Sequence, residues 1–442
     1  MAPCRARSLL VQRPMSAVPP LTPSFEAALA CLSGLGGPAG QSVTGHHAGL
    51  RLASHFQPIF SLSHGRVVGH EALLRASDAT GAGLPPPRFF DGHDSNELLW
   101  RDQLVRTMHM ANYAKAAPQS QWLFLNLHPQ VFLQSPQTTF DACSEAMPAD
   151  LRLQPKQIVV EVLEDAVRDD ANFDAAVATI RSQGGLIALD DFGAGHSNFD
   201  RVWRLRPEIV KLDRSLVERA ALDLRARRVV IQMTSLLHEC GALVLMEGVE
   251  TEAEAFVALE ADADLVQGYF FARPQAALVG PNHASEALNA IWSGFGERWR
   301  EEDAGYRERI APYFNAIGYA SALLAGGRPL EEATQSFLAL PGTELCYLLG
   351  QDGRQVGVNQ WGRSPAAGNG TAFEPFRDTR GARWARRPYF RRAVAAVGKV
   401  QVTRPYRTLH GSHLCVTVST AFRAPASQGG ELQVICGDLT WS

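Results

Sequence analysis

The sequence predicts an α/β protein in which a TIM-like (β/α)8 barrel is followed by a smaller α+β domain. The first observation behind this fold class is that strand-like and helix-like runs alternate from about residue 50 to residue 275, as in a parallel sheet covered by helices. The second is that the strand-like runs number close to eight. An open doubly wound sheet also fits the alternation, but the strand count and the length favour the closed barrel.

The expected barrel strands are short runs rich in aliphatic and aromatic residues. They lie at 56–60, 67–74, 122–126, 158–162, 186–189, 209–212, 243–246 and 265–267. The helix-like runs between them include 97–116, 172–183, 224–239 and 252–259. These lengths are typical of strands and of helices in globular proteins.

A polar side chain ends or follows nearly every expected strand. These residues are Glu71, Asn126, Glu161, Asp190, Asp191, Lys211, Glu247 and Gln267. The carboxyl ends of parallel barrel strands meet on one face, where barrel active sites are built. We therefore expect residues far apart in the sequence to converge on one site.

Composition excludes several classes of protein. The chain has 442 residues, 46% hydrophobic and 20% charged, with a net charge of -3, so nothing predicts a DNA or membrane partner. Its 7 cysteines include no CxxC pair, which is typical of a reducing compartment. No apolar run is long enough for a membrane helix, and we expect a soluble, cytoplasmic protein.

The chain divides into four segments on composition and periodicity. Residues 1–48 are rich in Pro, Gly, Ser and Ala and are expected to form a flexible N-terminal tail. The barrel is expected at 49–280 and a helical connector at 281–316. Residues 317–442 contain short β-like runs and turn-rich gaps, which predict the smaller α+β domain.

The predicted cluster of acids indicates a site for hard cations. Packed carboxylates repel one another, and burial penalises each charge. Bound cations relieve both effects, and oxygen ligands favour Mg²⁺ or Mn²⁺ over zinc. Two such ions, bridged by a carboxylate, are a common arrangement for phosphodiester hydrolysis.

Seven short motifs follow one another along this segment. They are EALLR at 71–75, NLHPQ at 126–130, EVLE at 161–164, DDFGAGHS at 190–197, KLD at 211–213, EGVE at 247–250 and QGY at 267–269. The EAL family has these motifs in the same order, so residues 52–275 resemble an EAL domain, a family of cyclic di-GMP phosphodiesterases. The resemblance implies hydrolysis of cyclic di-GMP to linear pGpG by two Mg²⁺ or Mn²⁺ ions.

The resemblance also implies a role for each matching residue. The expected metal ligands are Glu71, Asn126, Glu161, Asp190, Asp191 and Asp213. The expected catalytic residues are Lys211, which holds the attacking water, Glu247, as general base or metal orienter, and Glu71. The expected substrate-binding residues are Arg75, Gln57, Leu74 and Gln267. Glu164 and Glu250 are expected to anchor the loop that follows Asp190.

One position departs from the family pattern. Leu163 stands where the third motif usually has Thr, which puts the hydrogen bonding around Glu164 and the loop in doubt. A cyclic di-GMP receptor without turnover is the alternative function, and a pure interaction protein is a third. Every acid and the lysine are present, which favours the enzyme, and family members of this type often form homodimers.

The C-terminal segment resembles, more weakly, PDC or Cache-like sensor domains. The similarity lies in WARRPYFRRA at 384–393, PYR at 405–407, TVS at 417–419 and the closing GD at 437–438. It implies a small-molecule ligand contacted by Trp384, Arg387, Tyr389, Tyr406 and Asp438. A PAS-like module without ligand, in which these aromatic residues form the core, is the alternative.

Overall fold

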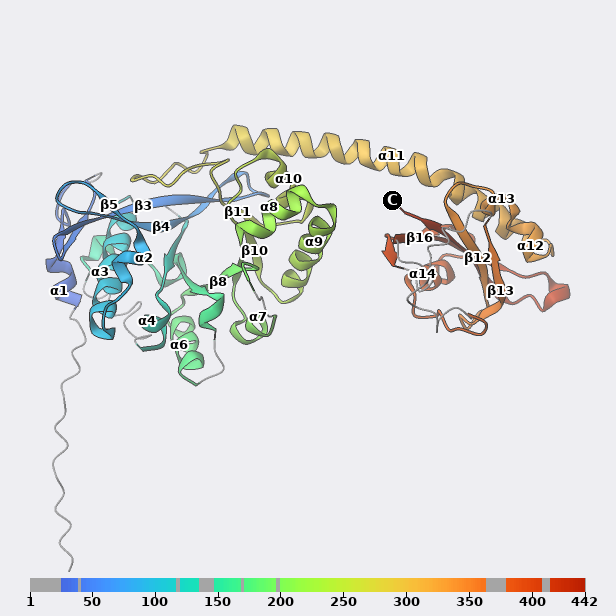
Figure 1. Cartoon of the computed structure of the whole chain (residues 1–442), viewed down its shortest axis with the longest axis horizontal. Helices are drawn as coiled ribbons and strands as arrows, with labels where there is room; N and C mark the ends of the chain where they lie inside the picture. Colours follow the sequence, from blue (N-terminus) through green and yellow to red (C-terminus); the bar gives the residue numbers. More distant parts are fainter. Residues whose placement is uncertain are drawn as a thin grey trace, which may run out of the picture. The chain divides into compact units, whose positions relative to one another are not determined.

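The computed structural model describes residues 25–38, 41–116, 120–134, 147–167, 171–195, 199–362, 379–407 and 414–441. The chain forms two compact units that divide between Gly296 and Glu297 (Figure 1). The first contains the predicted barrel and the second the predicted α+β domain. In the described residues no helix is both long and apolar enough to cross a membrane.

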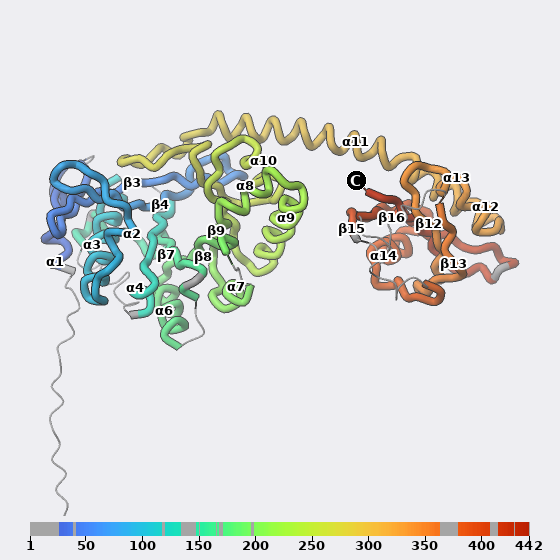
Figure 2. The backbone as a smooth tube through the Cα atoms, viewed as in Figure 1, coloured from blue at the N-terminus to red at the C-terminus, as the bar shows by residue number. Residues whose placement is uncertain are grey.

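Eight strands close into the barrel that the sequence predicts. They are β3 (Leu50–Ser61), β4 (Arg66–Ser77), β6 (Trp122–Asn126), β7 (Ile158–Leu163), β8 (Leu186–Phe192), β9 (Ile209–Leu212), β10 (Leu243–Met246) and β11 (Leu265–Val266). Neighbours pair in the order β3-β11-β10-β9-β8-β7-β6-β4, and the pairing of β3 with β4 completes the circle. Figure 2 lets the reader follow the chain through these strands.

The expectation of a fully parallel barrel is wrong for one strand. β3 runs antiparallel to both of its neighbours, β4 and β11, whereas the other pairs around the barrel are parallel. The cause is local, because only four residues separate β3 from β4. A hairpin needs no more, whereas a parallel crossover needs a dozen residues or more. Gly65 supplies the positive φ of this turn, 59°.

Helices cover the outside of the barrel (Figure 1). They are α3 (Ser95–Ala116), α4 (Pro129–Gln134), α6 (Ala171–Ser182), α7 (Phe199–Leu205), α8 (Arg214–Leu222), α9 (Leu224–Glu239) and α10 (Glu252–Glu260). Their starts follow from sequence. Asp213 and Asp223 cap α8 and α9, and Thr251 and Glu254 form a reciprocal capping box on α10. Single 3₁₀ turns lie at Ala149–Leu151, Pro155–Gln157, Glu164–Ala166 and Ala426–Gln428.

The barrel interior contains one apolar layer to which every strand contributes. Its members are Ile59, Phe124, Val159, Ala188, Ile209, Leu245 and Leu265, with Val68 packed against them. Only the lumen is shared by all eight strands, so this layer fills it. The layer forms an apolar floor below the carboxyl ends of the parallel strands.

The predicted tail, 1–48, is structured in its described part. Helix α1 (Phe25–Ala30) and strands β1 (Leu32–Ser33) and β2 (Thr44–His47) precede the barrel, and β2 extends the sheet through β3. Ala28 and Val43 are fully buried, and burial of these apolar side chains favours folding of this segment. Residues 1–24 of the predicted tail lie outside the described residues.

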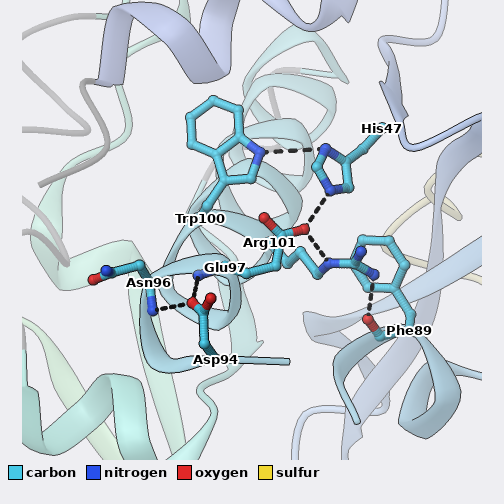
Figure 3. A network of polar contacts seen from close by, with 7 residues as sticks. All are labelled: His47, Phe89, Asp94, Asn96, Glu97, Trp100 and Arg101. Atoms are coloured by element: carbon cyan, nitrogen blue, oxygen red, sulfur yellow. Dashed lines mark hydrogen bonds and ion pairs between the residues drawn. The ribbon is translucent and has the colours of Figure 1, made fainter. Parts of the chain in front are cut away.

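A polar network holds this segment and α2 (Pro86–Phe90) against the start of α3 (Figure 3). Trp100 donates to Nδ1 of His47 at 3.3 Å, so His47 can donate from Nε2 to Glu97 at 2.7 Å. Glu97 also accepts from Arg101 at 2.8 Å, and Arg101 donates to the carbonyl of Phe89 at 2.7 Å. The edge strand β5 (Gly83–Leu84) pairs with β4 nearby.

A single helix replaces the predicted connector of 281–316. Helix α11 (Ser285–Ala325) has 41 residues and runs past the division between the units. Its first part buries Leu288 and Ile291 in the core of the first unit. Its second part buries Ile310 and Ile317 in the core of the second. The predicted break at 316 is absent because the apolar spacing of α11 continues into the second unit.

The second unit is an antiparallel sheet with helices on both faces. Its strands lie in the order β13 (Gln355–Trp361), β12 (Thr343–Leu349), β17 (Leu432–Thr440), β16 (Leu414–Arg423) and β14 (Gln401–Val402), with β15 (Tyr406–Arg407) paired to β16. α11, α12 (Leu330–Ala333) and α13 (Gln335–Leu338) pack on one face. α14 (Pro388–Ala395) packs on the other.

Candidate active site

A polar layer lies directly above the apolar floor of the barrel. Side chains on a strand alternate between its two faces, so a residue two positions beyond a floor residue also points into the lumen. The parallel strands β6 to β11 thereby contribute Asn126, Glu161, Asp190, Lys211, Glu247 and Gln267. On the reversed strand β3 the same step leads to Gln57, which lies opposite Glu71 on β4. The convergence predicted from the sequence is therefore explained by strand periodicity.

Lys211 lies at the centre of this layer. Its side chain is 1% exposed and forms ion pairs with Glu161, with Asp190 at 2.9 Å and with Glu247 at 2.6 Å. Burial lowers the pKa of Lys211, but the neighbouring carboxylates outweigh burial and hold that pKa well above the usual lysine range. The carboxylates around Lys211 therefore favour its protonated form.

Glu71 is held by two amide side chains. Asn126 donates to one carboxylate oxygen of Glu71 at 2.9 Å, and Gln267 donates to the other at 2.8 Å. Amide oxygens of both partners thus turn away from Glu71. This arrangement fixes the Glu71 carboxylate at the mouth of the barrel, where it faces the other acids.

A bulge in β8 brings two consecutive aspartates to the same place. Regular strand geometry would send Asp190 and Asp191 to opposite faces. The pairing of β8 with β9 shifts register between Leu189 and Phe192, and Asp191 has a φ of 56°, a left-handed conformation that Asp tolerates better than most residues. Carboxylate oxygens of Asp190, Asp191 and Glu247 consequently lie within 4.8 Å of one another.

Three acids of the site, Glu161, Asp191 and Glu247, have pKa values above the ordinary carboxyl range. Burial raises the pKa of Glu247 to about 8 against the pull of Lys211. Burial likewise raises the pKa of Glu161 well above its usual range, and the charge of Glu71 adds to this effect. Burial and then the charge of Asp190 raise the pKa of Asp191. A cation that neutralised these carboxylates would therefore bind strongly.

The donor set fits a hard divalent cation. The Oε2 atom of Glu161 is buried and, within the described ranges, has no hydrogen-bond partner. The nearby ligand atoms are carboxylate and amide oxygens, the kind that Mg²⁺, Mn²⁺ and Ca²⁺ prefer. Carboxylate oxygens of Asp190, Asp191 and Glu247 lie close enough together to hold one ion, and Glu247 was not among the expected ligands. The residues present therefore fit a hard divalent cation.

Asp213 lies at the start of α8, one residue after β9. It caps this helix by accepting from the backbone N–H of Ser215 at 3.0 Å. Its negative charge adds to the raised pKa of Asp191, so it lies near the second aspartate and outside the tight group of three. Asp213 is therefore a neighbour of Asp191 at the mouth of the barrel.

The rim of the site is formed by the motifs that follow β10 and β11. A pocket of about 200 Å³ is lined by Gln57, Glu71, Arg214, Glu247, Gly248, Glu250, Gln267, Gly268 and Tyr269. A Cβ atom on Gly268 would lie 2.0 Å from the carbonyl oxygen of Val249, so only glycine fits there. Arg273 stacks over the ring of Tyr269 at 4.3 Å and holds it at the rim.

The remaining predicted substrate and loop residues lie around this mouth. Arg75 is exposed, and its guanidinium donates to the carbonyl of Leu74 at 2.9 Å, while Leu74 itself is buried. Glu164 is buried and pairs with Arg201 at 2.9 Å. Glu250 forms an ion pair with Arg214 of α8 at 2.6 Å. His196 and Ser197, in the predicted loop, lie outside the described residues.

Sequence reasoning missed Arg201, Arg214 and Tyr269. Arg214 directly follows the KLD motif and Tyr269 ends the QGY motif, so adjacency to a motif was the available signal. Arg201 has no such signal, because its partner Glu164 is far away in sequence and lies on a different element.

The five residues predicted for a sensor ligand share one face of the second sheet. Tyr406 donates to Thr417 at 2.5 Å, and Thr417 donates to Asp438 at 2.7 Å. Arg387 lies 5.9 Å from the ring centroids of both Trp384 and Tyr406. Burial raises the pKa of Asp438 to about 7, although the hydrogen bond from Thr417 opposes this. Tyr389 packs in the same cluster.

Comparison with known families is consistent with this geometry. The sequence model of the EAL domain matches residues 46–274, just over half of the chain. The chain belongs to the EAL domain family.

Two curated EAL relatives come from Pseudomonas aeruginosa. The cyclic di-GMP phosphodiesterase RocR is 27% identical over 228 residues, which cover 50% of this chain and 57% of RocR. The cyclic di-GMP phosphodiesterase NbdA is 30% identical over 241 residues, covering 51% of this chain and 29% of NbdA. The chain therefore matches only part of the length of each relative.

One solved EAL structure is similar over both units. It is that of the Bacillus subtilis YkuI protein, which was solved in complex with substrate c-di-GMP and calcium. The TM-score is 0.74 at 19% identity, and the match covers 88% of this chain and 96% of YkuI. At this identity the likeness establishes the fold, including that of the second unit.

Proposed function

We propose that this chain is a phosphodiesterase that hydrolyses cyclic di-GMP to linear pGpG with two Mg²⁺ or Mn²⁺ ions. Membership of the EAL family supports this proposal, as does the naming of RocR and NbdA as cyclic di-GMP phosphodiesterases. The observation that carries it is the contact of Lys211 with three carboxylates at the mouth of the barrel.

The proposed reaction breaks one P–O3′ bond of the cyclic dinucleotide. The oxygen of a water molecule forms a new bond to that phosphorus, and the freed O3′ takes up a proton. The product is therefore linear and carries a 5′-phosphate. Bound divalent cations would activate water and offset charge on the phosphate, and Glu71, Asn126, Glu161, Asp190, Asp191 and Asp213 are the residues that would hold them.

The protein groups next to the cations have separate roles in this proposal. Lys211 stays protonated, so it serves as a hydrogen-bond donor to the water and as positive charge near the phosphate. Glu247 acts either as the general base for that water or as an orienter of a metal ion. Arg75 and Gln57 bind the nucleotide, and the planar guanidinium of Arg75 suits two phosphate oxygens.

The competing function is a receptor that binds cyclic di-GMP without turnover. Binding alone does not require a buried lysine surrounded by carboxylates. Burying so many ionisable groups costs stability unless bound metal ions offset the excess negative charge. The intact set from Glu71 to Gln267 therefore favours the enzyme.

Incubation with cyclic di-GMP tests the proposal directly. We expect pGpG to form with Mg²⁺ or Mn²⁺ and not after removal of divalent ions, as followed by chromatography. YkuI was solved in complex with substrate c-di-GMP and calcium, so we expect that binding to this chain can be measured in calcium. Tight binding in calcium with no pGpG in Mg²⁺ or Mn²⁺ would establish the receptor instead.

We further propose that the second unit regulates the barrel by binding a small molecule. The support is the clustering of Arg387, Trp384, Tyr389, Tyr406 and Asp438 on one sheet face. Thermal shifts of the full chain with amino acids and small carboxylates test this proposal, and Asp438→Asn should abolish any shift. A ligand-free PAS-like module predicts no shift with any compound.

A homodimer and a cytoplasmic location complete the proposal. Sedimentation of the purified chain with and without Mg²⁺ tests the dimer, and a mass of one chain under both conditions would contradict it. Fractionation of the source cells tests the location.

A further inference from the structure

An ion pair outside the set of expected ligands joins two elements that flank the metal site. Arg201 donates to the Oε1 atom of Glu164 at 2.9 Å. The side chain of Glu164 is 7% exposed and that of Arg201 is 26% exposed. A charge-assisted hydrogen bond in such a sheltered place is stronger than a surface pair, and loss of Arg201 would leave a buried carboxylate without this partner.

The two partners lie at either end of the stretch that carries Asp191. Glu164 follows β7 directly, and its neighbour Leu163 is in register with Asp190 on β8. The chain then leaves β8 after Phe192 and enters α7 at Phe199. Arg201 lies in the first turn of α7. The ion pair therefore ties the start of α7 back to the strand beside the aspartates.

The backbone conformation of Asp191 depends on the contacts that fix the segment between β8 and α7. Its φ of 56° is a left-handed conformation in a non-glycine residue, which persists only where the surroundings enforce it. The rings of Phe192 and Phe199 meet edge to face at 5.4 Å, so a shift of α7 is transmitted to the residue next to Asp191. The Arg201–Glu164 pair limits such a shift.

Leu163 makes this ion pair more important. The hydroxyl expected at that position from the family resemblance is missing, and the leucine side chain is 36% exposed. Glu164 must therefore be oriented by other groups, and Arg201 is a described partner.

We propose that Arg201 is a positioning residue, which acts through Glu164 to fix the start of α7 and hence the carboxylate of Asp191 for metal binding. The inference rests on the proposed function only in requiring that the site binds a divalent cation. No contact between Arg201 and the nucleotide is involved.

The test compares Arg201→Ala with Arg204→Ala in the full chain. Arg204 lies one turn further along α7 and pairs with Asp174, whose side chain is 61% exposed, so it controls for loss of an arginine from the same helix. Manganese binding is measured by titration calorimetry without nucleotide. We expect binding about tenfold weaker in Arg201→Ala, the lower end of what loss of a ligand-orienting partner costs, and unchanged binding in Arg204→Ala.

Two further measurements separate positioning from simple stabilisation. Arg201→Lys keeps the ion pair and should recover most of the affinity, whereas Glu164→Gln combined with Arg201→Ala should bind no more weakly than the worse single variant. In assays with nucleotide, Arg201→Ala should regain nearly normal kcat at high Mn²⁺ with an unchanged KM.

Each outcome decides the matter. Equal manganese affinity in wild type and Arg201→Ala overturns the inference, even if thermal stability falls. Equal weakening in both arginine variants also overturns it, because the effect would then belong to α7 in general. If the wild type binds manganese without hydrolysing cyclic di-GMP, the proposed function fails and the inference is still tested. If the wild type binds no divalent ion, both fail.

Discussion

The ammonium group of Lys211 is buried, stays charged and contacts three carboxylates. Each of these acids would destabilise the barrel if it were charged and unpaired. Lys211 therefore has a structural effect as the partner of these acids and a chemical effect in the proposed reaction. The two effects can be separated because bound metal ions would take over part of the first.

We predict that Lys211→Ala lowers turnover about 10²–10³-fold, the usual effect of removing one preorganised donor. Binding of cyclic di-GMP in calcium should stay measurable by calorimetry, because the cations still neutralise the acids. Lys156→Ala removes an exposed lysine near the start of β7 and serves as the control. Unchanged turnover in Lys211→Ala would refute the role given to this residue.

The raised pKa of Glu247 implies a pH dependence for the stability of the metal-free protein. Its pKa of about 8 in the folded state lies above the ordinary value of 4.5, so the folded chain retains a proton that the unfolded chain releases between these values. The free energy of unfolding should therefore decrease as pH rises from about 5 to about 8. Thermal melts in EDTA measure this decrease as a falling Tm.

Glu247→Gln should make this decrease smaller, since the amide does not titrate, while the raised pKa values of Glu161 and Asp438 still contribute. Glu252→Gln, on the exposed start of α10, should leave it as in wild type. Added Mn²⁺ should raise the Tm most near pH 8, where the carboxylates are most ionised. A metal-free Tm that rises between pH 6 and pH 8 would contradict the assignment.

At the scale of single residues, much of the site could be predicted from the sequence. Asn126, Glu161, Asp190, Lys211, Glu247 and Gln267 each end a recognisable strand, and strand periodicity then aims them into one lumen. The Arg201–Glu164 pair could not be predicted, because it depends on how α7 packs after β8. The left-handed conformation of Asp191 could not be predicted either, because a bulge in so short a strand does not visibly change the hydrophobic pattern.

Among the elements, the two loops after β10 and β11 are joined by backbone contacts at the rim of the site. Val249 donates to the carbonyl of Gln267 at 3.1 Å, and Phe270 donates to the carbonyl of Val249 at 3.0 Å. Gly268 lies inside this pairing, where any side chain would meet the backbone of Val249. The position of Gln267, and through it that of Glu71, depends on this close approach.

We predict that Gly268→Ala lowers kcat/KM at least about tenfold and weakens manganese binding. The added methyl group must push the two loops apart and displace Gln267, and a 1 Å misplacement has large effects on catalysis. Gly241→Ala is a control for conformational strain alone, because Gly241 has a φ of 86° with open space around it. Normal metal affinity in Gly268→Ala would contradict this prediction.

Element types were predictable where hydrophobic periodicity is strong, as in β6, β9, β10 and α9, whose bounds match the prediction. The direction of β3 was not predicted, because alternating runs do not distinguish a hairpin from a crossover. The short gap between residues 61 and 66 was the available signal. The strands β1 and β2, before the barrel, were hidden by a composition typical of linkers.

At the scale of the whole molecule, α11 belongs to both hydrophobic cores. The helix contributes Leu288 and Ile291 to one unit and Ile310, Ile317 and Leu324 to the other. The division at Gly296 therefore falls inside α11.

We predict that removal of residues 297–442 changes kcat/KM at least about fivefold, the lower end of typical coupling between sites. The truncated chain retains the part of α11 that packs on the barrel, so its fold can be checked by circular dichroism. Kinetics and sedimentation of both forms provide the measurement. Identical kinetics and an identical subunit count would show that the second unit does not regulate the barrel.

The antiparallel β3 has a consequence for synthesis of the chain on the ribosome. β3 emerges early, yet its partner β11 is about 200 residues away, and at typical elongation rates this interval lasts roughly 10–40 s. During that time Ile59 and Phe60, both fully buried in the finished barrel, can pair with β4, but the opposite edge of β3 lacks its partner β11. An unpaired apolar edge recruits other chains, so nascent-chain chaperones should engage this hairpin until β11 arrives.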